Sequence, residues 1–60
     1  MNPSDFIYVQ IYRGAIRAGA KEPKAKDNAI AGLEEWKKGK FKKPSMLIEQ
    51  RIKQAKRESK

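Results

Sequence analysis

The sequence predicts an all-α protein, a small three-helix domain with a basic C-terminal half. Hydrophobic residues recur at helical spacing in three separate segments. Glycine and proline residues mark the breaks between these segments. A chain of 60 residues is long enough for one small domain only. We therefore expect residues 1–60 to form a single domain with helices near residues 3–18, 24–39 and 44–57.

The first predicted helix has one apolar face, formed by Ile7, Ile11, Ala15 and Ala18. Asn2 or Ser4 can cap its start, and Gly19 is placed to end it. The stretch FIYVQIY, residues 6–12, is rich in β-branched and aromatic residues, which favour a strand. Nothing else in the chain supplies a partner strand, so we prefer the helix.

The second predicted helix has begun by Asp27 at the latest. Pro23 is either the last residue of the connector or the first residue of this helix. Its apolar face is formed by Ala25, Ala29, Gly32, Leu33 and Trp36. The small residues allow a neighbouring helix to approach closely, and Trp36 is expected to be the largest core residue. Gly39 is positioned at the C-terminus of this helix.

The third predicted helix begins near Pro44 or Ser45 and has a narrower apolar face. That face is formed by Ile48, Ile52 and Ala55, with Leu47 on its flank. We expect the last few residues of the chain to fray.

Composition excludes most chemistry. The chain has no cysteine and no histidine, which removes disulfides, thiolate chemistry, imidazole catalysis and the usual zinc ligands. A domain of this size buries too little surface to build a rigid catalytic cleft. No apolar run approaches the length of a membrane helix, and the first residues do not resemble a secretion signal. We expect a cytoplasmic protein that is not an enzyme, with no cofactor and no membrane partner.

Three smaller patterns have structural explanations. The stretch GAIRAGAK, residues 14–21, lacks the lysine spacing and hydroxyl residue of a phosphate-binding loop, so we interpret its small residues as a helix contact. Glu34 and Glu35 point about 100° apart on a helix and cannot share a ligand. Tyr8 and Tyr12 lie one turn apart and are expected at the edge of the core rather than in a stacking platform.

Positive charge is concentrated in the C-terminal half. The formal net charge is +8; bases and acids balance in residues 1–35, and residues 36–60 contain ten bases and two acids. Residues 37–43 read KKGKFKK, with five lysines around Phe41. Lysine binds phosphate as a point charge without fixed geometry, which suits a nucleic-acid backbone. Phe41 can stack on a base or fold inward, and the lysines can also simply maintain solubility.

The sequence therefore favours a nucleic-acid-binding protein that contacts phosphates of DNA or RNA with little sequence preference. The predicted contact residues are Lys37, Lys38, Lys40, Phe41, Lys42 and Lys43 in the loop and Arg51, Lys53, Lys56 and Arg57 in the third helix. A helix-turn-helix fits only loosely, because the connection is long and base-reading side chains are sparse.

Two other hypotheses remain open. The protein can be an accessory or inhibitor protein, phage-encoded or ribosome-associated, that docks on an acidic surface of a larger protein or ribonucleoprotein. It can also form a homodimer, which the sequence would build from Ile7, Ile11, Tyr8 and Tyr12.

Overall fold

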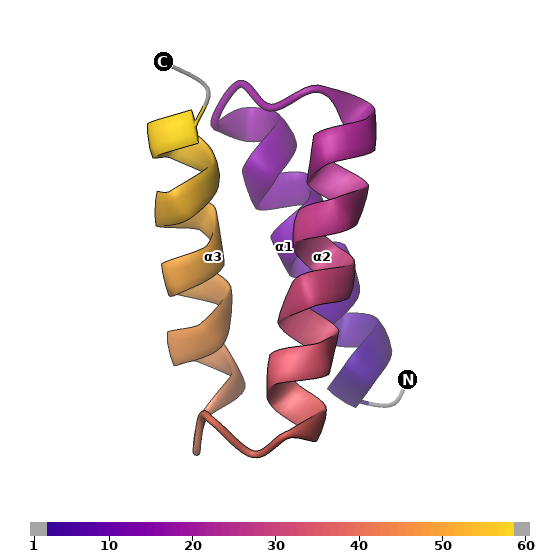
Figure 1. Ribbon diagram of the computed structural model, residues 1–60, viewed down its shortest axis with the longest axis vertical. Helices are drawn as coiled ribbons and strands as arrows, with labels where there is room; N and C mark the ends of the chain where they lie inside the picture. Colours follow the sequence, from indigo (N-terminus) through magenta and orange to yellow (C-terminus); the bar gives the residue numbers. More distant parts are fainter. Residues whose placement is uncertain (1–2, 59–60) are drawn as a thin grey trace.

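The computed structural model describes residues 3–58, which form three helices packed side by side (Figure 1). These are α1, Pro3–Arg17, α2, Glu22–Lys37, and α3, Pro44–Glu58. Helices α1 and α3 run in the same direction and α2 runs against both, and each helix packs against the other two. The all-α prediction is confirmed, and the residues proposed as an alternative strand lie within α1. None of the helices in the described part of the chain is long and apolar enough to span a bilayer.

The core lies along the line where the three helices meet. Its largest fully buried side chains are Ile7, Ile11 and Leu47, which cluster with Ala29. The dimer contact that the sequence would build from Ile7 and Ile11 is therefore wrong, because both side chains are buried within one chain. A second cluster contains only alanines, namely Ala15, Ala25 and Ala55. Alanine side chains let the three backbones approach one another closely, so the core is narrower at the end of the bundle where α1 ends and α2 begins.

Two details of the predicted core are wrong. Trp36 is half-buried at the edge of the main cluster rather than its largest anchor, because it lies in the last turn of α2, where fewer neighbours surround it. On α3, Leu47 is fully buried, whereas Ile48 is only half-buried against the same cluster. The buried face of α3 is therefore rotated from the predicted one toward Leu47.

Two glycines allow close contacts between helices. A Cβ atom on Gly14 would overlap the side chain of Ile52, and a Cβ atom on Gly32 would overlap the Cδ1 atom of Ile11. Gly14 therefore belongs to a contact between α1 and α3, as the helix-contact interpretation of residues 14–21 predicts. Gly32 has the same role where α2 meets α1.

Helices α1 and α2 end in the same backbone motif. After α1, the amide of Gly19 donates to the carbonyl of Ile16 at 3.0 Å, and the amide of Ala20 donates to that of Ala15 at 2.9 Å. After α2, Gly39 and Lys40 repeat this pattern. Gly19 has φ 105° and Gly39 has φ 75°, a region that favours glycine. Ser4, one of the two predicted caps, lies inside α1 and does not precede it. The other predicted cap, Asn2, falls outside the described residues, as do residues 59–60 of the C-terminal end that is predicted to fray.

Candidate nucleic-acid interface

The lysine loop, residues 37–43, forms one end of the bundle, at the bottom of Figure 1. Lys37 is the last residue of α2, and the rest of the loop connects α2 to α3. The side chains of its five lysines are all exposed. None of the ion pairs seen among residues 3–58 uses a lysine of this loop. The loop therefore presents a concentrated positive charge that the described part of the chain does not neutralise.

The two helix termini beside the loop respond to this charge in opposite ways. The C-terminus of α2 carries a partial negative charge from its free carbonyl groups, so Lys37 and Lys38 stabilise it. The N-terminus of α3 carries a partial positive charge, and Lys42 and Lys43 precede it directly. The first turn of α3 contains no acidic residue. Folding of α3 therefore gains nothing from these two lysines, and an anion at this position would stabilise both them and the helix terminus.

Phe41 lies inward rather than toward solvent. Its side chain is half-buried and packs against the main core cluster of Ile7, Ile11, Ala29 and Leu47. Of the two orientations that the sequence leaves open, the structure shows the inward one. The ring attaches the middle of the lysine loop to the core, while the lysines on either side project outward.

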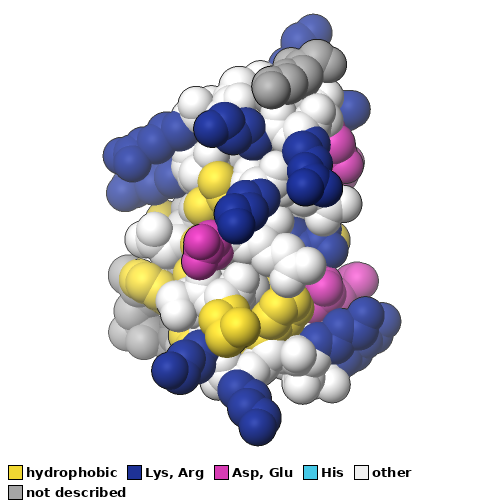
Figure 2. All heavy atoms as spheres, turned by 90° about the vertical axis from the view of Figure 1, so that its left-hand side faces the viewer, with side chains coloured by type: hydrophobic (Ala, Val, Ile, Leu, Met, Phe, Trp, Pro, Cys, Tyr) yellow, Lys and Arg dark blue, Asp and Glu magenta, His cyan; other side chains and the backbone are white. Residues whose placement is uncertain are grey.

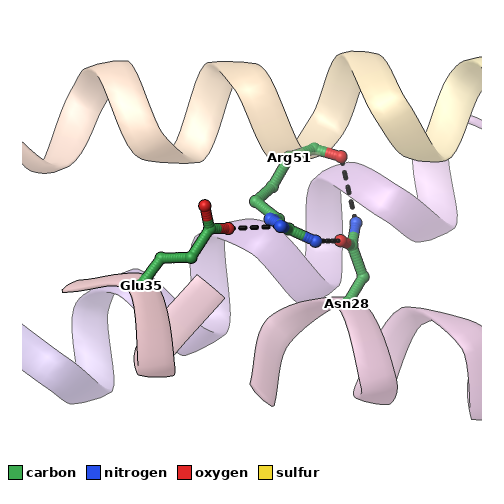
Figure 3. A network of polar contacts seen from close by, with 3 residues as sticks. All are labelled: Asn28, Glu35 and Arg51. Carbon is green, nitrogen blue, oxygen red and sulfur yellow. Dashed lines mark hydrogen bonds and ion pairs between the residues drawn. The ribbon is translucent and has the colours of Figure 1, made fainter. Parts of the chain in front are cut away.

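Arg51 is engaged within the protein (Figure 3). Its guanidinium forms an ion pair with Glu35, and its Nη1 atom donates a hydrogen bond to Oδ1 of Asn28 at 3.1 Å. The Nδ2 atom of Asn28 donates in return to the backbone carbonyl of Arg51 at 3.0 Å. The Arg51 and Glu35 side chains are only 19% and 21% exposed. Arg51 thus joins α3 to α2, and its pairing competes with the phosphate contact that the sequence predicts for it.

The other predicted residues of α3 lie away from the lysine loop. The Nζ atom of Lys53 is 3.9 Å from Oε1 of Glu49, in a pair that is largely exposed. Lys56 and Arg57 occupy the last turn of α3, about 20 Å along the helix axis from the loop. The fold therefore places the loop lysines at one end of the molecule, Lys56 and Arg57 near the other, and Arg51 and Lys53 between them. Figure 2 shows the side of the bundle on which α3 lies, with Lys and Arg side chains near both ends and hydrophobic side chains gathered in its lower half.

Sequence reasoning missed the basic residues that join Lys56 and Arg57 at the opposite end. A cavity of about 320 Å³ there is lined by Lys21, which directly precedes α2, by Lys24 of α2, and by Ala55 and Glu58 of α3. The charge balance of residues 1–35 hides this grouping, because the nearby acids cancel the lysines in the sum. The antiparallel order of three helices is the signal that could have revealed it, since it places residues 19–24 beside the end of α3.

The two tyrosines of α1 pack at the core edge, as the sequence predicts. Tyr8 and Tyr12 are half-buried, and their rings are parallel within 7° with centroids 6.4 Å apart. The hydroxyl of Tyr12 donates to Oε1 of Glu22 at 3.0 Å. Burial, and then the hydrogen bond and charge of Glu22, raise the pKa of Tyr12 above its ordinary value. Tyr12 therefore connects α1 to the start of α2, Tyr8 packs against the main core cluster, and the two half-buried rings do not form an open stacking surface.

Comparison with known proteins returns no relative: no family model, curated protein or solved structure matches this chain. Residues 3–58 also contain no group of three or more acidic side chains placed to hold a metal ion.

Proposed function

We propose that the protein binds nucleic acid through the phosphate backbone, with little sequence preference, and that the lysine loop is the principal contact surface. The observation that carries this proposal is the position of Lys42 and Lys43 before the N-terminus of α3. Two exposed cations there oppose the helix dipole and have no acidic partner in the first turn. Proteins keep residues that oppose folding where function requires them, and an anionic ligand would give these two lysines such a function.

The proposed contact combines side-chain and backbone groups. A phosphate beside Lys42 and Lys43 would also face the first backbone amides of α3, which lack partners within the helix. Lys37, Lys38 and Lys40 would reach neighbouring phosphates through long, flexible side chains. Lysine makes no fixed bidentate contact with a base edge, so the interaction would carry little sequence information. Phe41 would hold the loop against the core rather than stack on bases.

The salt dependence of binding to a 20-base-pair DNA duplex tests this proposal. Five lysines that release counterions give a slope of about −4 to −5 for log affinity against log salt. Changing Lys40, Lys42 and Lys43 together to Gln should reduce the magnitude of the slope by up to about 3. The matched control changes Lys21, Lys24 and Lys26 to Gln, which removes the same charge at the opposite end of the bundle. It should alter the slope much less.

Two results would count against the lysine loop. Equal effects of the two triple variants would mean that binding responds to net charge rather than to this site. Absence of binding to DNA and to RNA at low salt, where electrostatic attraction is strongest, would reject a nucleic-acid function. Docking on an acidic protein surface would then become the leading hypothesis, and partners retained from nuclease-treated lysate would support it.

A further inference from the structure

Positive charge is concentrated at both ends of the bundle. The end opposite the lysine loop, residues 17–27 and 56–58, brings together the end of α1, the start of α2 and the end of α3 (Figure 1). We call this surface the second basic end. Its charged residues are six exposed cations, Arg17, Lys21, Lys24, Lys26, Lys56 and Arg57, and three acids, Glu22, Asp27 and Glu58. Outside the two ends, the described residues contain three bases and four acids, so positive charge is in excess only at the ends.

Helix stability explains three of these six cations. Arg17 is the last residue of α1, and two others lie in the last turn of α3, where a cation complements the partial negative charge of a helix C-terminus. Lys21, Lys24 and Lys26 lie instead around the start of α2, where the helix dipole does not favour a cation. Glu22 in the first turn offsets one of them. None of the ion pairs seen among residues 3–58 uses these three lysines.

The surface between α2 and α3 at this end is concave. The cavity of about 320 Å³ described above is lined by Lys21 and Lys24 on one side and by Ala55 and Glu58 on the other. The connection between α1 and α2 closes it with Gly19 and a neighbouring alanine. Two flexible lysines beside a hollow of small residues can approach a phosphate group from more than one direction.

The sides of the bundle between the two ends are less suited to phosphate. Arg51 and Lys53 lie on the α3 side, and each already pairs with a glutamate of the same chain. Ile30 on α2 and Met46 on α3 are 48% and 56% exposed, and apolar side chains gain nothing from a charged backbone. A duplex is therefore attracted to the ends of the bundle rather than along its length.

We infer that the second basic end binds a second segment of nucleic acid, so that one molecule bridges two duplexes. This inference rests on the proposed function of the lysine loop. The loop and the start of α2 lie about 20 Å apart along the helix axis, in a bundle whose longest extent is 29 Å. Each end therefore reaches phosphates that the other does not. The three acids lower the net charge of the second basic end, so its contact is the weaker of the two.

Capture of a second duplex tests the bridge. A 20-base-pair duplex is fixed to beads, and a fluorescent duplex of unrelated sequence is added with the purified protein at low salt. We expect the protein to retain the fluorescent duplex on the beads. Retention should rise and then fall as protein is added, because excess protein occupies each duplex separately.

Changing Lys21, Lys24 and Lys26 together to Gln separates the bridge from the loop contact. Capture of the second duplex should fall at least about tenfold, because up to three phosphate contacts are lost. Affinity for a single duplex should fall less than about threefold, because the lysine loop is intact and the removed charges are screened from it. Gln and Lys have similar helix propensities, and circular dichroism checks that the variant remains helical.

The matched control changes Lys40, Lys42 and Lys43 to Gln, which gives the same net charge. It should lower the affinity for a single duplex at least about tenfold, and capture should fall with it. Equal effects of the two triple variants on single-duplex affinity and on capture would overturn the inference, because net charge alone would then explain both measurements.

The remaining outcomes distinguish this inference from the proposed function. Protein that stays on the fixed duplex but captures no second duplex would overturn the bridge and leave the proposed function intact. Undiminished capture by the variant of Lys21, Lys24 and Lys26 would also overturn the bridge, since two loops from different copies would then join the duplexes. Protein that does not stay on the fixed duplex would reject the proposed function and the bridge together.

Discussion

The two connections between helices begin in the same way and then differ. Each leaves its helix through a glycine with positive φ, Gly19 after α1 and Gly39 after α2. The first connection then returns to the core through Ala20 and enters α2 with Glu22 in the first turn. The second connection exposes its lysines and enters α3 with no acid in the first turn.

This difference separates what the fold requires from what it only tolerates. An acid in the first turn of a helix complements the partial positive charge there, and Glu22 also accepts a hydrogen bond from Tyr12. The first connection therefore suits the helices on both sides better than the second, because Glu22 offsets the cation Lys21 that directly precedes α2. The second has the same backbone motif, so its geometry does not explain its charge. The lysines before α3 are the residues for which a ligand gives the better explanation.

The largest expected effect comes from Phe41, the residue that ties the second connection to the core. Phe41→Ala should lower the free energy of unfolding by about 2 kcal/mol, less than a fully buried phenylalanine would cost, because the ring is half-buried. Urea denaturation measures this change, and Phe41→Leu should restore most of the loss. Unchanged stability with weaker binding to single-stranded DNA would instead identify Phe41 as a stacking residue.

A smaller effect is expected at the two glycines that the connections share. Gly19→Ala and Gly39→Ala should each cost about 1 to 2 kcal/mol, because L-residues rarely adopt positive φ. At Gly39 no atom lies within 4 Å of an added Cβ, so the cost there is backbone strain alone. Chemical synthesis with D-Ala at position 39 provides the control, since a D-residue favours positive φ. If L-Ala and D-Ala give the same melting temperature, the second turn does not depend on this conformation.

Helical periodicity predicts most of the fold. Apolar spacing and the two turn glycines give all three helices, with ends within two residues of those observed. Periodicity does not say how far a neighbouring helix extends, so it does not reveal that Trp36 lies at the end of the bundle. Periodicity also identifies the apolar face of α1 that packs in the core, but it does not show that the side chains of Phe6, Val9 and Ile16 are exposed to solvent.

The candidate site is less predictable because its electrostatics depend on three-dimensional neighbours. The exposed lysines of the loop follow directly from a dense basic run. The pairing of Arg51 within the protein could not be predicted from the sequence, since its partners Asn28 and Glu35 are distant in sequence and contact it only when α2 packs against α3. The separation of Lys56 and Arg57 from the loop likewise depends on the direction of α3.

The smallest expected effect is a change in the free energy of unfolding that has opposite signs for substitutions at the two ends of the lysine loop. Changing Lys42 and Lys43 to Gln removes two cations from the N-terminus of α3 and should raise the free energy of unfolding by about 0.5 to 1 kcal/mol. Changing Lys37 and Lys38 to Gln removes two cations from the C-terminus of α2 and should lower it by a similar amount. Both pairs reduce the net charge equally, so relief of general repulsion cancels in the comparison. Thermal melts at low salt measure the difference, which salt should diminish.

Both pairs should weaken binding to duplex DNA, so a Lys42 and Lys43 variant that is more stable but binds less would show that these lysines oppose folding and serve the ligand. Equal stability changes in the two pairs would mean that the loop charge acts only through the net charge of the protein.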